Sequence, residues 1–126
     1  MESLSLKGNS QHPEVLLDQE KGVIEFSGNS LPEDAKGFFD PIINWIDKYI
    51  EVPNNETTVS FRMSYYNTPS SKLIYQILKK FEGLHSNQGN VNIIWHFPND
   101  DPDMKEAGKD YAENIKVPFK FQSYEE

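Results

Sequence analysis

Residues 57–72 read TTVSFRMSYYNTPSSK, and this stretch decides how the rest of the chain is interpreted. Residues 57–65 are rich in β-branched and aromatic side chains, which is typical of a strand. Residues 67–71 then carry the signals of a helix start, because Pro69 suits the first helical position and Thr68 suits the capping position before it. A strand that passes directly into a helix indicates an α/β domain.

Three helices are predicted from apolar residues that recur at helical spacing. The first starts after Pro32, and Pro41 within it predicts a kink or a restart near Asp40, because proline lacks a backbone donor. The second ends near Gly83, and the third spans residues 104–116. Their apolar faces comprise Phe38, Phe39, Ile42, Ile43, Trp45, Ile46, Tyr49 and Ile50, then Leu73, Ile74, Ile77, Leu78 and Phe81, then Met104, Ala107, Tyr111, Ala112 and Ile115.

Four further runs have strand character and complete the order β-β-α-β-α-β-α-β. Residues 15–17 and 23–26 flank a turn at Gly22 and predict an antiparallel hairpin, and residues 91–97 predict another strand. Residues 117–121 predict an edge strand, because Pro118 cannot donate to a ladder. Right-handed crossovers then give a single domain, residues 1–126, with a mixed five-stranded sheet and a loose tail at 1–12.

The composition limits the partners that the domain can take. Twenty acidic against 12 basic residues give a net charge of −8, which disfavours nucleic acid and anionic membrane surfaces. The chain has no cysteine, no apolar run long enough to span a bilayer and no hydrophobic signal-peptide core at its start. These features predict a cytoplasmic protein.

Residues with catalytic or ligand-binding potential form no recognisable constellation. The three histidines lie far apart in the sequence, and no glycine-rich phosphate loop occurs. An acidic cluster, defined by Asp100, Asp101, Asp103 and Glu106, is interpreted as a helix start rather than as a metal site, since its spacing is not that of a calcium loop. We therefore predict no enzyme activity, cofactor or metal; a metal-dependent hydrolase that uses this cluster is the remaining catalytic alternative.

Thr68 has two compatible interpretations. As a helix cap, its hydroxyl contributes on the order of 1 kcal/mol. As a phosphoacceptor, it offers a surface position beside helix amides, where a phosphate adds about −1.5 to −2 charges without melting the helix. Ser70 and Ser71 share the helix start and are alternative acceptors.

The chain resembles the SiaC family of bacterial regulatory phosphoproteins over nearly its whole length. The most specific part of the resemblance is Tyr66-Asn67-Thr68-Pro69-Ser70-Ser71-Lys72. It is supported by Gly28-Asn29-Ser30-Leu31-Pro32-Glu33, by Trp45-Ile46, by the segment from Asp100 to Gly108 and by Val117-Pro118-Phe119.

The resemblance implies a non-catalytic threonine switch with a STAS-like fold. Thr68 would be phosphorylated by a serine/threonine kinase of the anti-sigma-kinase type and dephosphorylated by a type 2C phosphatase. The unphosphorylated form would bind and activate a diguanylate cyclase in cyclic-di-GMP and biofilm signalling, through a surface formed by Tyr66, Asn67, Thr68, Pro69, Ser70, Ser71 and Lys72. The alternative is an anti-sigma-factor antagonist in a partner-switching pathway.

Overall fold

The strands lie in the sheet in the same order as in the chain. The computed structural model describes residues 1–125, which form a six-stranded sheet and three helices. The strands are β1 (Leu4–Leu6), β2 (Glu14–Asp18), β3 (Val23–Ser30), β4 (Thr57–Tyr66), β5 (Val91–Pro98) and β6 (Phe119–Tyr124). The helices are α1 (Ala35–Glu51), α2 (Thr68–Ser86) and α3 (Pro102–Asn114).

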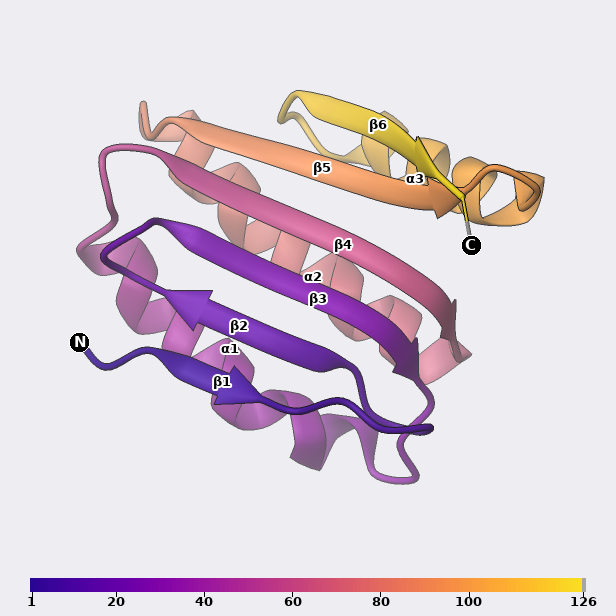
Figure 1. Ribbon diagram of the computed structural model, residues 1–126. Coiled ribbons are helices and arrows are strands. Elements are labelled where there is room, and N and C mark those ends of the chain that lie inside the picture. Colours follow the sequence, from indigo (N-terminus) through magenta and orange to yellow (C-terminus); the bar gives the residue numbers. More distant parts are fainter. Residues whose placement is uncertain (126) are drawn as a thin grey trace.

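This strand order sets the layers of the fold. Strands β1 to β3 pair in antiparallel fashion and β3 to β6 in parallel, so each helix crosses to the next strand in the same direction. All three helices consequently cover one face of the sheet and leave the other open (Figure 1). The carboxyl ends of β3, β4 and β5 lie at the same end of the sheet as the starts of the helices that follow them. A site is therefore expected at this end.

The α/β class and the N-terminal hairpin were predicted correctly, but the sheet has six strands rather than five. The predicted loose tail is also wrong, because Leu4–Leu6 pairs with β2 and Trp45 Nε1 donates to the Glu2 carbonyl at 2.8 Å. A three-residue strand is too short to show an alternating pattern, so its sequence carried no recognisable signal.

Pro41 does not interrupt α1. The helix runs unbroken from Ala35 to Glu51, with Asp34 as its cap, so the predicted restart near Asp40 is wrong. Pro41 is exposed, and its missing N–H therefore leaves an unpaired carbonyl on the solvent side of the helix. Strand β6 lies at the sheet edge as predicted, although it begins two residues later, at Phe119.

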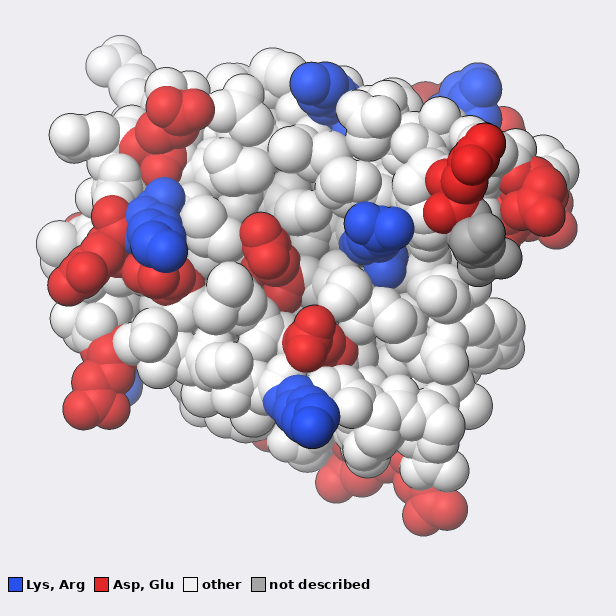
Figure 2. All heavy atoms as spheres, in the orientation of Figure 1, with Lys and Arg blue, Asp and Glu red and all other residues white. Residues whose placement is uncertain are grey.

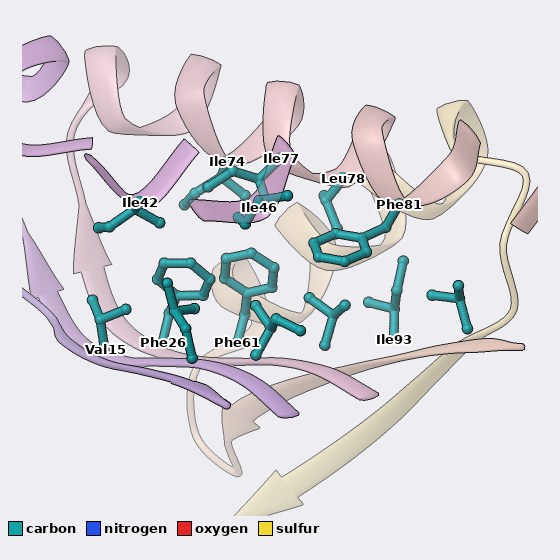
Figure 3. Packing of buried hydrophobic residues seen from close by; sticks show 14 of the residues in the cluster. Val15, Phe26, Ile42, Ile46, Phe61, Ile74, Ile77, Leu78, Phe81 and Ile93 are labelled. Atoms are coloured by element: carbon teal, nitrogen blue, oxygen red, sulfur yellow. The ribbon is translucent and has the colours of Figure 1, made fainter. Parts of the chain in front are cut away.

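The core lies between the sheet and the helix layer. In Figure 3, Ile74 and Ile77 of α2 lie over the aromatic rings of Phe26 and Phe61 on neighbouring strands. These two rings stack with their centroids 4.9 Å apart, because the parallel register of β3 and β4 places Phe26 beside Phe61. The core thus holds the middle of both strands against α2.

Candidate functional site

A β-bulge near the end of β4 determines which side chains face the helices. Gly28 pairs with Met63 and Asn29 with Tyr65, so Ser64 is an extra residue. The extra residue reverses the alternation of the strand, and Tyr66 therefore faces inward while Tyr65 is 56% exposed. Sequence patterning alone did not reveal this reversal.

The helix that follows begins one residue earlier than predicted. Asn67 is the cap of α2, because its Oδ1 accepts a hydrogen bond from the Ser70 N–H at 3.0 Å. Thr68 is therefore the first helical residue and Pro69 the second, and the prediction that Thr68 caps the helix is wrong. Asparagine and threonine both cap helices well, and proline is tolerated throughout the first turn. The sequence therefore does not distinguish a cap at Asn67 from a cap at Thr68.

The hydroxyl groups at this helix start differ in accessibility. Thr68 is exposed, whereas Ser70 is completely buried, with its Oγ 2.8 Å from Ser30 Oγ. Ser71 is half-buried, and its Oγ lies 3.0 Å from the Tyr111 hydroxyl. The predicted exposure of Ser70 must therefore be corrected, and Thr68 is the hydroxyl most open to a modifying enzyme.

The buried serine pair provides a stability test. Replacing Ser70 with alanine is expected to lower the free energy of unfolding by about 1–3 kcal/mol, because the Ser30 hydroxyl then loses its partner in the interior. The double variant Ser30→Ala/Ser70→Ala should regain part of this loss. Chemical unfolding followed by circular dichroism measures both, with Ser86→Ala at the exposed end of α2 as control. Strictly additive losses would contradict a specific pairing.

A groove next to this helix start separates α2 from α3. It has a volume of about 510 Å³, and its walls include Tyr66, Ser71, Lys72, Tyr75 and Tyr111. The Tyr111 hydroxyl donates to the Ser71 carbonyl at 2.9 Å and thereby ties α3 to the first turn of α2. The groove has no signal in the sequence, because no local spacing relates residues 40 positions apart.

Tyr66 and Tyr111, the two half-buried tyrosines of the groove, keep their protons at neutral pH. Burial raises the pKa of Tyr66, and the neighbouring Tyr111 hydroxyl raises it further. Burial also raises the pKa of Tyr111, although contact with Ser71 and Tyr66 acts in the opposite direction. The two hydroxyls therefore remain uncharged and able to donate hydrogen bonds.

Acidic loops flank Thr68 at the edge where β3, β4 and β5 end. Glu33 and Asp34 lie on the loop after β3, and Asp100 and Asp101 on the loop after β5. On the face shown in Figure 2, acidic side chains also gather at the right-hand rim, the end at which these strands finish in Figure 1. A negative group added to Thr68 would therefore lie between two acidic loops.

The acidic cluster from Asp100 to Glu106 serves the start of α3, as predicted. Asp101 Oδ1 accepts from the Met104 N–H at 2.9 Å, and Asp103 lies in the first turn. Within residues 1–125, no three His, Cys, Asp or Glu side chains are grouped so as to hold a metal ion. The same range contains no helix with the length and apolar character needed to cross a membrane.

Comparisons with known proteins agree with the fold and with the resemblance seen in the sequence. SiaC of Pseudomonas aeruginosa has a TM-score of 0.90 at 25% identity, covering 98% of this chain and 100% of that chain. A chain in the crystal structure of the diguanylate cyclase SiaD in complex with its activator SiaC, from the same organism, has a TM-score of 0.91 at 25% identity. The match covers 96% of this chain and 99% of that chain.

Sequence comparisons support the same assignment. An uncharacterized protein of Pseudomonas aeruginosa strain UCBPP-PA14 is 25% identical over 126 residues, the full length of both chains. The model of the SiaC family regulatory phosphoprotein matches residues 6–124. This chain therefore belongs to the SiaC family of regulatory phosphoproteins.

Proposed function

We propose that this domain is a non-catalytic regulator that binds and activates a diguanylate cyclase, and that phosphorylation of Thr68 switches the binding off. The observation that carries the proposal is the exposure of Thr68 beside a buried Ser70 and a half-buried Ser71. The solved complex of the relative SiaC with the cyclase SiaD supports the choice of partner.

The position of Thr68 suits a switch that leaves the fold intact. Its hydroxyl is exposed and does not provide the cap of α2, so a phosphate there breaks no buried contact. The phosphate nevertheless adds about −1.5 to −2 charges at neutral pH. The surface read by a partner then changes sharply while the core does not.

The enzymes of the proposed switch are a serine/threonine kinase of the anti-sigma-kinase type and a type 2C phosphatase. Both need a side chain that projects into solvent, a condition that Thr68 meets. Since the kinase consumes ATP and the cyclase consumes GTP, the proposed place of action is the cytoplasm.

Mass spectrometry after incubation with such a kinase and ATP tests the acceptor. One phosphate is expected, on Thr68, because it is the accessible hydroxyl of the helix start. Thr68→Ala should abolish the modification, whereas Ser71→Ala should retain it. A phosphate that persists in the Thr68→Ala protein would rule the assignment out.

A further inference from the structure

The first turn of α2 has few free donors for a phosphate. The Asn67 N–H donates to the Ser30 carbonyl, and the Ser70 and Ser71 N–H groups donate to Asn67. Pro69 has no N–H to offer. The helix start therefore leaves a phosphate at this position at most the N–H of Thr68 itself, rather than several free amides.

Lys72 is the cation best placed to do so. It lies four residues after Thr68 on α2, and side chains at this spacing are neighbours on one helix face. Both residues are exposed, and Lys72 takes part in none of the ion pairs found within residues 1–125. The loops on either side contribute only acids here, namely Glu33, Asp34, Asp100 and Asp101.

The same lysine also borders the groove between α2 and α3. We propose that a phosphate on Thr68 captures Lys72 and draws its ammonium group away from that groove. The inference rests on the proposed function, since it takes Thr68 as the acceptor. Lys72 is then the residue through which the domain itself responds to the modification.

Pairing of the phosphate with Lys72 gives phosphorylation two electrostatic effects on the surface. The phosphate adds negative charge at the start of α2, and the groove loses the positive charge that Lys72 supplies in the unmodified domain. A partner that uses an acidic group to contact Lys72 is consequently repelled by the phosphate and also deprived of its counter-ion.

A ³¹P NMR titration of the full chain with genetically encoded phosphothreonine at position 68 tests the pairing. A lysine beside the phosphate stabilises its dianion, so the second pKa of the phosphate should rise by about 0.15–0.4 units in Lys72→Met. Lys72→Arg should keep the lower pKa. Lys48→Met, which removes the same charge from the last turn of α1, is the matched control and should leave the pKa unchanged.

The difference between the unsubstituted protein and Lys72→Met should shrink in 1 M salt, because exposed pairs are screened. Equal phosphate pKa values in the two proteins, or an equal rise in Lys48→Met, would overturn the inference. Because the phosphate is introduced during translation, this result does not depend on any kinase. Failure of the pairing is therefore distinguishable from failure of Thr68 as the natural acceptor.

Discussion

Replacing Trp95 with alanine is expected to lower the free energy of unfolding by about 3–5 kcal/mol. The side chain is completely buried on β5, and its ring lies within 5.5–6.3 Å, between centroids, of Phe61, Tyr66 and Tyr111. Its Nε1 also donates to the Met104 carbonyl at 2.9 Å. The loss therefore combines a large cavity with the removal of an anchor for α3.

Urea unfolding followed by circular dichroism measures this effect. Val52→Ala is the control, because Val52 is 66% exposed and its truncation should change the unfolding free energy by less than about 0.5 kcal/mol. Gly108 contacts the same ring closely enough that an added Cβ would lie 2.3 Å from Trp95 Cδ1. A loss below about 1 kcal/mol for Trp95→Ala would show that α3 does not depend on this packing.

Phosphothreonine at position 68 is expected to weaken binding to the diguanylate cyclase by about 100-fold or more. Like charges brought together at an interface cost several kcal/mol, and each 1.4 kcal/mol is a factor of ten in affinity. Thr68→Glu carries less charge and should produce a smaller loss, while Thr68→Ala should bind almost normally. Titration calorimetry with the purified cyclase gives the three affinities.

The control for this measurement separates local from overall charge. Ser86→Glu adds a carboxylate at the opposite end of α2, where the side chain is also exposed, and should leave the affinity within about twofold. An equal loss in Ser86→Glu and Thr68→Glu would indicate a general effect of net charge. Unchanged affinity of the phosphorylated protein would refute the switch itself.

The predictable part of the fold came from segments long enough to show a period. The apolar face of α2 and the alternation in β4 spanned many residues, so their types and order followed directly from the sequence. The proline at 118 likewise indicated an edge strand, and β6 lies at the edge. The structure differs from the prediction where an element is short, such as β1. It also differs where two neighbouring residues could both serve as a helix cap, as at the start of α2.

The site was harder to predict because its geometry depends on contacts between distant residues. Thr68 was recognisable from its surroundings in the sequence, but the burial of Ser70 follows from its contact with Ser30 on another strand. The bulge at Ser64 and the closure of the groove by Tyr111 likewise depend on tertiary pairing. Local patterns therefore indicated a helix start at Thr68, and the resemblance to the SiaC family made Thr68 the proposed acceptor, whereas the surface around it required the assembled domain.

The sequential strand order has a consequence for synthesis on the ribosome. Each strand adds to the edge left by the previous one, so the sheet can grow in the order of translation, and every pairing joins strands that are consecutive in the chain. The hydrogen bonds that join the start of α2 to β3 need only chain up to α2, because Asn67 and Ser70 bond to Ser30. Thr68 can therefore take its place at the start of α2 before α3 emerges to complete the groove.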